Sequence, residues 1–366
     1  VALNEGSVDT VRWSIGGKSI DVFTGLNGEE YVETPDASDG EVGFKLSGVN
    51  IGLVFQRELG SDRSWVSLKT TASAASAIGL DLLGVEASGT GVAVALNIGS
   101  DGETVIDYSS APLSVALPND SGNIDLDFDG ANGQLASVKG DFSLSVGNFF
   151  HLDGLLGFRT ATELLTLADG SVIEARVFTV GGTDLSAFAG IGGPPTVNAD
   201  AFGLALSDVE FGLMLAVPEA EQPAVNGLSW TALQATAGSV SVVGIPGLTL
   251  AVENAAVAIN LVNGVPEGED AADRVLDFAA RSFNILTGSE SGLTLDMDGA
   301  QGELLRVAAD ITLAIEDFFH VSGSVAFERA RADVTLYDTT DQTTATTTVE
   351  ALTIGGTGLN AFVGLD

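Results

Sequence analysis

The stretch WSIGGKSIDVFTG at residues 13–25 recurs as FTVGGTDLSAFAG at residues 178–190 and as LTIGGTGLNAFVG at residues 352–364. Its apolar residues alternate with small or polar ones, a period of two that is typical of half-buried strands. The glycine pairs at its centre recur about 165 and 174 residues apart, at Gly16 and Gly17, Gly181 and Gly182, and Gly355 and Gly356. This period is longer than that of short solenoid repeats. Because glycine tolerates unusual backbone angles, we expect each pair to form a corner between units.

Further blocks follow in the same order in both halves of the chain. GFKLSGVNIGLV at residues 43–54 matches GLALSDVEFGLM at residues 203–214, and NFFHLDG at residues 148–154 matches DFFHVSG at residues 317–323. Several blocks in one order indicate a true internal repeat. We therefore predict the end of a preceding repeat, two repeat units and the start of a third, at residues 1–14, 15–179, 180–353 and 354–366.

Short alternating segments broken by Gly, Asn and Asp occur throughout the chain, and helical stripes are hard to find. The sequence therefore predicts an all-β fold of two tandem modules with mainly antiparallel strands. Either β-sandwiches or an open stacked β-structure would satisfy the pattern. The units join without a Pro-rich or Ser-rich linker, which favours an elongated rod over beads on a flexible string.

The composition narrows the classes of partner. The chain has 14 basic and 50 acidic residues and a net charge of −36, which disfavours nucleic acid and anionic membrane surfaces. It has no cysteine, so disulfides and thiolate metal sites are excluded. No apolar run reaches about 18 residues, so we expect no membrane-spanning segment.

Aromatic residues and histidines recur once per unit. Large aromatic side chains are mostly buried, so we expect them to anchor the core. The two histidines each follow a Phe pair, and we expect them to be structural and hydrogen-bonded. These positions are Trp65, Trp230, Phe149, Phe150, His151, Phe318, Phe319 and His320.

Catalytic motifs are scarce. The chain lacks a Gly-x-Ser-x-Gly elbow, His-based zinc spacing and a Gly-rich loop ending in Lys-Ser or Lys-Thr. Two histidines offer little from which to build a general acid and base. We therefore predict no catalytic residues and no enzymatic activity.

Calcium is the one cofactor that the sequence suggests. Asp125, Asp127 and Asp129 precede Gly130 in the Asp-x-Asp-x-Asp-Gly form that opens a calcium loop. In the second unit the match shrinks to Asp296 and Asp298. The alternative is a strand that carries its carboxylates on one face and ends in an Asp-Gly turn. Both interpretations stay open from the sequence.

The ordered blocks and the acidic, cysteine-free composition resemble the tandem modules of giant bacterial secreted and cell-surface proteins, which are adhesin-like and often exported by type I systems. The blocks that carry the resemblance are Ile-Gly-Gly, Ala-Phe-Gly-Leu-Ala-Leu-Ser, Gly-Leu-Thr-Leu and Phe-Phe-His. The Gly-Gly-x-Gly-x-Asp nonapeptide of the best-known calcium-binding repeats is absent. The resemblance implies an extracellular or cell-surface location and a structural, adhesive or filament-forming role.

Under this interpretation the partners are other copies of the chain or adjoining repeats. Two alternatives remain. A curved sheet that lines an apolar groove would bind lipids or other hydrophobic ligands, in keeping with a mean hydropathy of +0.32. A carbohydrate-binding adhesin module would bind surface glycans and would need exposed aromatic residues beside carboxylates.

Overall fold

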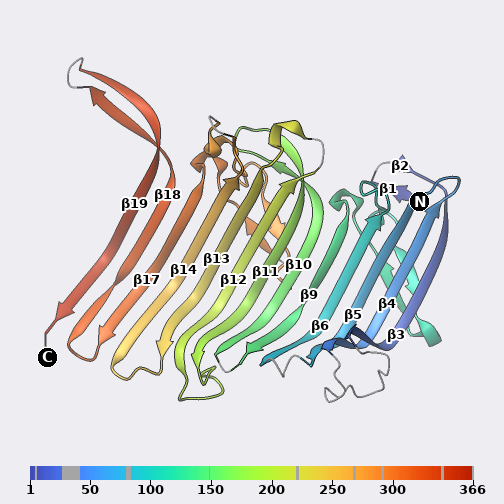
Figure 1. Ribbon diagram of the computed structural model, residues 1–366, viewed down its shortest axis with the longest axis horizontal. Coiled ribbons are helices and arrows are strands. Elements are labelled where there is room, and N and C mark those ends of the chain that lie inside the picture. Colours follow the sequence, from blue (N-terminus) through green and yellow to red (C-terminus); the bar gives the residue numbers. More distant parts are fainter. Residues whose placement is uncertain are drawn as a thin grey trace.

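The computed structural model describes residues 1–4, 6–26, 42–79, 84–147, 149–219, 222–266, 269–289, 292–338 and 342–364. Within them the chain is all-β, as predicted, and thirteen strands form one antiparallel sheet (Figure 1). All thirteen strands are 12 to 21 residues long because period-two alternation continues through them. They are β3 (Thr10–Leu26), β4 (Val42–Glu58), β5 (Ser64–Ile78), β6 (Val85–Gly99), β9 (Leu135–Val146), β10 (Phe150–Thr166), β11 (Val172–Ile191), β12 (Phe202–Pro218), β13 (Ser229–Val243), β14 (Leu248–Asn263), β17 (Leu304–Ile315), β18 (Phe319–Asp338) and β19 (Thr343–Val363).

The strands follow chain order across the sheet, with two excursions. The segment between β6 and β9 contains a small hairpin of β7 (Leu113–Ala116) and β8 (Asn123–Leu126). The segment between β14 and β17 contains the equivalent hairpin of β15 (Phe283–Ile285) and β16 (Leu293–Leu295). A further pair, β1 (Ala2–Leu3) and β2 (Gly6–Ser7), lies beside the first excursion. No helix among the described residues has the length and apolarity needed to cross a membrane.

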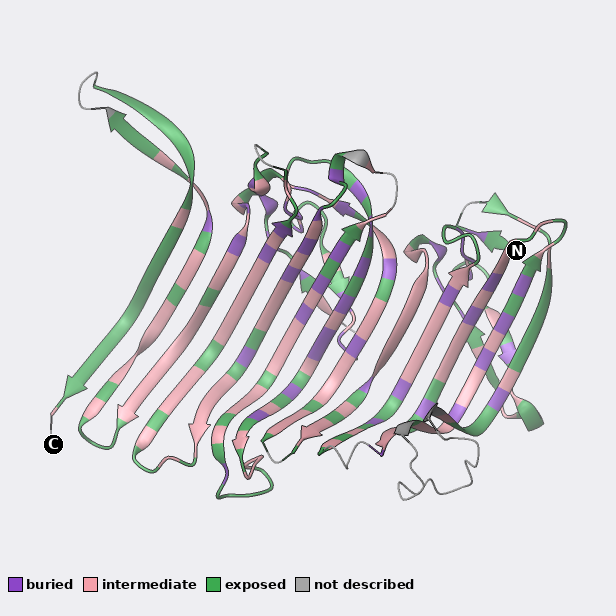
Figure 2. Ribbon diagram, in the orientation of Figure 1, coloured by how far each residue is buried: buried purple, intermediate pink, exposed green. Residues whose placement is uncertain are grey.

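The two hairpins pack against one face of the sheet, here called the covered face, and lie behind the strands in Figure 1. The opposite face is here called the open face. Each hairpin closes a hydrophobic core against the covered face (Figure 2). Trp65 and Trp230 anchor these cores, each with 1% of its surface exposed.

The glycine pairs do not form corners, so that expectation is wrong. Each pair lies inside a strand, and none of the six glycines has a positive φ. The first glycine of a pair instead allows a covering segment to approach. A Cβ on Gly16 would lie 2.0 Å from the carbonyl oxygen of Ala116, and one on Gly181 would lie 2.5 Å from that of Leu286.

The predicted unit boundaries fall within strands. Residue 15 lies in β3, residue 180 in β11 and residue 354 in β19. The sheet runs on from unit to unit, since β10 pairs with β11 and Gly157 lies opposite Gly181. Of the two predicted architectures, the structure is therefore the open stacked one.

Candidate functional site

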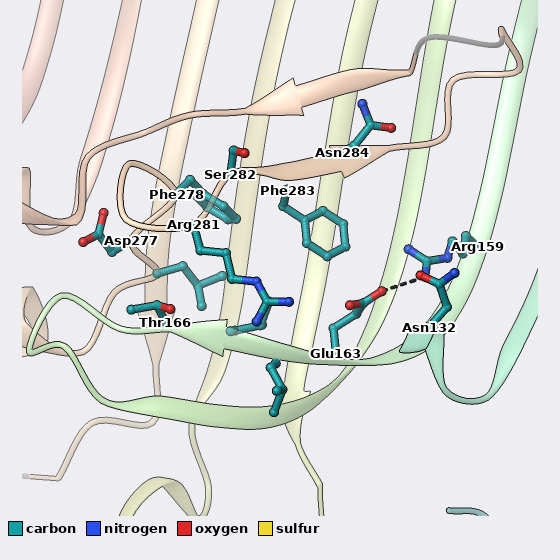
Figure 3. Close-up of a pocket in the computed structure, with 13 residues that line it drawn as sticks. Asn132, Arg159, Glu163, Thr166, Asp277, Phe278, Arg281, Ser282, Phe283 and Asn284 are labelled. Carbon is teal, nitrogen blue, oxygen red and sulfur yellow. Dashed lines mark hydrogen bonds and ion pairs between the residues drawn. The ribbon is translucent and has the colours of Figure 1, made fainter. Parts of the chain in front are cut away.

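A cleft of about 340 Å³ lies where the two units meet (Figure 3). Its floor comes from the end of β10, and its walls come from the turn before β9 and from the excursion that carries β15. The charged and polar side chains of the lining are Asn132, Arg159, Glu163, Thr166, Asp277, Arg281, Ser282 and Asn284. Leu164, Leu165, Leu276, Phe278 and Phe283 complete it.

An ion pair forms one side of the cleft. Nη2 of Arg159 lies 2.6 Å from Oε1 of Glu163, and both side chains are mostly buried. The same nitrogen lies 3.4 Å from Oδ1 of Asn132, which ties β10 to the turn of the first unit. Charge-assisted hydrogen bonds of this kind hold a side chain in one geometry.

Arg281 projects into the cleft from the second unit (Figure 3). Its side chain makes no ion pair within the described part of the chain. The nearby carboxylate of Asp277 is engaged, because its Oδ1 accepts hydrogen bonds from the backbone N–H groups of Ala279, Ala280 and Gly299. Arg281 is thus the available charged donor.

The cleft is suited to binding. Guanidinium and amide groups beside the Phe278 and Phe283 rings would hold a small anion with an apolar body. Its lining contains no His, Cys or Lys, so its residues offer no imidazole base, thiolate or amine nucleophile. The sequence hardly signals this site, because its two halves are more than a hundred positions apart. One signal existed: Arg159 and Glu163 depart from the repeat, where Glu328 and Ala332 stand.

The two histidines lie far apart in the sheet, on β10 and β18, with five strands between them. His151 lines a second cavity of about 280 Å³ together with Asp153, Phe188 and several serines. Nε2 of His151 is buried without a hydrogen-bond partner, so the expectation of a hydrogen-bonded histidine is wrong for that atom. No serine hydroxyl is bonded to Nε2, and a nucleophile–base pair is therefore not formed there. His320 is exposed.

The recurring aromatic residues divide into two groups. Both tryptophans are buried in the cores, whereas Phe150 and Phe319 are half-buried. Phe149 and Phe318 are 58% and 50% exposed, so the expectation that they belong to the core is wrong. They sit in the turns before β10 and β18, where no covering hairpin reaches.

The aspartates of the calcium hypothesis already have partners. Asp127 forms an ion pair with Lys69, and Asp125 accepts a hydrogen bond from Ser114 at 2.5 Å. Asp129 and Asp298 each cap a 3₁₀ turn by accepting from the backbone N–H two residues on. Asp296 accepts from Gln234 at 2.8 Å.

Within the described residues, no cluster of three acidic or histidine side chains could hold a metal ion. The Asp-Gly turn of the alternative interpretation is present at Asp129 and Asp298. Calcium binding stays a prediction, which calorimetric titration with calcium chloride tests.

Comparison with known families finds no family model that matches the chain. Curated proteins likewise yield no match at a significant level.

Proposed function

We propose that this chain is a non-enzymatic structural segment of an extracellular or cell-surface protein, in which repeat units extend one continuous β-sheet. One observation carries the proposal: the pairing that joins the two units is made again at β19. Gly157 of β10 lies opposite Gly181 of β11, and the equivalent Ala326 of β18 lies opposite Gly355 of β19. The extracellular location follows from the resemblance alone.

The covered face of β19 supports the same proposal. Gly181 lies beneath the hairpin of its unit, with Leu286 at 2.5 Å from a Cβ built on it. Gly355 occupies the equivalent place and has nothing within 4 Å of such a Cβ. The open space above Gly355 has room for a covering hairpin like those of the first two units. We propose that a further unit, in the same chain or in another copy, adds to this edge.

The function of such a segment is to lengthen the protein. Neighbouring strands lie about 4.8 Å apart, so six strands of a unit add about 29 Å to the sheet. The joint between units is a ladder of backbone hydrogen bonds and carries no flexible linker. Paired edges also protect a long sheet from unwanted aggregation.

Small-angle X-ray scattering tests the proposal with two chains, the present one and one in which residues 180–353 are duplicated in tandem. We expect the maximum dimension to grow by about 29 Å. A matched control carries a flexible Gly-Ser linker between the duplicated units and should give a broader distance distribution. An unchanged maximum dimension in the duplicated chain would contradict sheet extension.

The carbohydrate-binding alternative loses its main candidates, since Trp65 and Trp230 are buried and cannot stack on a sugar. The lipid-binding alternative keeps one supporting observation, the uncovered apolar side chains of the open face. Flotation of the chain with phosphatidylcholine vesicles would distinguish lipid binding from self-association.

A further inference from the structure

The open face carries rows of apolar side chains that run across the sheet. Residues opposite each other on neighbouring strands point to the same face, so a row can be followed from strand to strand through the pairing register. The central row takes one residue from every strand. It contains Gly17, Ile51, Thr70, Val94, Val138, Phe158, Val180, Leu213, Leu233, Ile259, Leu305, Arg329 and Leu352.

The two rows on either side of it also consist mainly of apolar residues. The first contains Ile15, Leu53, Leu68, Leu96, Ala136, Thr160, Phe178, Leu215, Thr231 and Leu261. The second contains Gly140, Leu156, Gly182, Phe211, Ala235, Val257, Val307, Phe327 and Ile354. These three rows are here called the apolar rows.

Charge is nearly absent from the apolar rows. The chain has 50 acidic residues, yet none of them lies in these rows. The one charged member is Arg329, whose Nη2 lies 2.8 Å from Oε2 of Glu350, so its charge is balanced. A strongly acidic protein thus keeps three rows without a carboxylate, and Glu350 lies beside them.

Most side chains of the apolar rows are half-buried, Gly17, Gly140 and Gly182 are buried, and several large side chains are exposed. Phe178, Leu215 and Val307 are between 40% and 44% exposed, and Ile15 is 53% exposed. The whole chain exposes 19633 Å², whereas a compact monomer of its mass would expose about 13,700 Å². Contiguous apolar patches far above a few hundred Å² mark interaction sites in soluble proteins.

We propose that a second copy of this chain covers the open face, so that two sheets pack face to face on their apolar rows. The area fits a stable dimer. The 32 residues of the three rows each cover about 4.8 by 6.6 Å, so two copies would bury about 2,000 Å² between them. That area lies at the lower end of the range of permanent homodimers, about 2,000–5,000 Å².

Geometry and charge also fit a second copy. Open sheets pack about 10 Å apart with strand directions about 30° apart, and a two-fold axis brings the same rows together from both copies. The acidic side chains of both copies stay outside the contact, where salt screens their repulsion. The dimer therefore strengthens as salt rises toward about 0.15 M. This pairing uses the face of the sheet and does not rest on the edge extension proposed above.

Sedimentation analysis of the purified chain from 1 to 100 µM tests the proposal. We expect a mass of twice 37.2 kDa at the upper concentrations. The substitution Leu213→Glu, at the centre of the apolar rows, should weaken the dimer by about 100-fold. The control Leu59→Glu changes an apolar residue in the β4–β5 turn that is 60% exposed and should leave the mass unchanged.

A second measurement does not depend on a buried charge. Because the chain has no cysteine, single cysteines at Leu215→Cys and Leu59→Cys give one reactive thiol each. We expect maleimide to label Cys in the Leu215 variant at least 10-fold more slowly at 100 µM than at 1 µM, and the Leu59 variant at equal rates. Circular dichroism confirms that each variant is folded.

Three outcomes would overturn the proposal. One is a monomer at all concentrations with labelling rates that do not change. Another is a dimer that Leu213→Glu leaves intact, which would place the contact at a sheet edge. The third is flotation of the monomer with phosphatidylcholine vesicles, abolished by Leu213→Glu, which would make lipid the occupant.

Discussion

The hydroxyl of Ser67 donates a hydrogen bond to Oδ1 of Asn97 at 2.9 Å, deep in the first core. In the second unit the equivalent residues are Ala232 and Asn260, which face each other across β13 and β14. Asn260 is fully buried and its Oδ1 has no partner. The two cores thus share an asparagine and differ in whether its side-chain oxygen receives a hydrogen bond.

The two units also differ in the hydrogen-bond network around this asparagine. In the first unit Gln56 donates to the Tyr108 hydroxyl at 2.8 Å, and that hydroxyl donates to Ser67 at 3.1 Å. Burial raises the pKa of Tyr108, so its hydroxyl remains a donor at neutral pH. The second unit has Ala216, Ala232 and Phe278 at the equivalent places. A buried polar network is favourable when all its members are hydrogen-bonded and costly when some are missing. This explains why the three residues are polar in the first unit and apolar in the second.

Removing all three variable members of this network should therefore cost less than the sum of the three single removals. Ser67→Ala leaves oxygen atoms of Asn97 and Tyr108 with fewer partners and should lower the free energy of unfolding by about 1–3 kcal/mol. The triple variant Gln56→Ala, Ser67→Ala, Tyr108→Phe adopts the residues of the second unit. We expect it to lose less than the three single variants combined, as measured by urea unfolding. A loss equal to that total would contradict cooperativity.

The second unit offers the reverse experiment. Ala232→Ser places a hydroxyl opposite Asn260 Oδ1, which lacks a donor. We expect the free energy of unfolding to rise by about 0.5–1.5 kcal/mol. Ala237→Ser on the same strand has no such acceptor and serves as the control. Equal effects of the two serines would show that the unpaired oxygen is not the cause.

The tryptophans make the same hydrogen bond in both cores. Nε1 of Trp65 donates to the carbonyl oxygen of Thr104 at 3.1 Å, and Nε1 of Trp230 donates to that of Arg274 at 2.7 Å. Trp230→Phe leaves this carbonyl unpaired and a small cavity, so unfolding should become easier by about 2–4 kcal/mol. Trp13→Phe, at a residue 61% exposed, should change it by less than about 0.5 kcal/mol. Thermal unfolding followed by circular dichroism compares the two.

Equivalent glycines should differ in their tolerance of a methyl group. Gly181→Ala drives a Cβ against the Leu286 carbonyl oxygen, 2.5 Å away, and should destabilise the chain by about 1–3 kcal/mol. Gly355→Ala meets no atom within 4 Å and should be neutral or slightly stabilising. Chemical unfolding of the two variants distinguishes them. Comparable losses would mean that strand conformation, rather than the covering segment, requires glycine.

Low pH should weaken the hydrogen bond by which the backbone N–H of Gly130 binds Asp107, within the segment between β6 and β9. The hydroxyl and backbone N–H of Ser109 and the backbone N–H of Gly130 bond to Asp107 and lower its pKa. A lowered folded-state pKa means that the stabilisation is complete above the unfolded value of about 3.9 and is lost as pH falls through the folded one. Asp107→Asn should therefore be less stable than the parent chain near pH 7. The difference between the two free energies of unfolding should begin to shrink below about pH 4 and disappear only below the folded-state pKa of Asp107. A constant difference would contradict this origin.

The sequence by itself determined the class of fold and its repetition. Alternation with a period of two requires strands, and the recurrence around Gly16, Gly181 and Gly355 requires equivalent strands. Burial of Trp65 and Trp230 also followed from the sequence, because large aromatic residues that recur in an apolar strand are best accommodated in a core. These are local properties, readable from neighbouring residues.

Only the tertiary structure decided what lies against each face of the sheet. A period of two separates two faces but does not say which receives a covering hairpin, so the part played by the glycines and the exposure of Phe149 could not be foreseen. The cleft beside Arg281 and Arg159 and the apolar rows depend on strand order and register. Both arise from contacts between residues that are distant in the chain, and such contacts leave little trace in a local pattern.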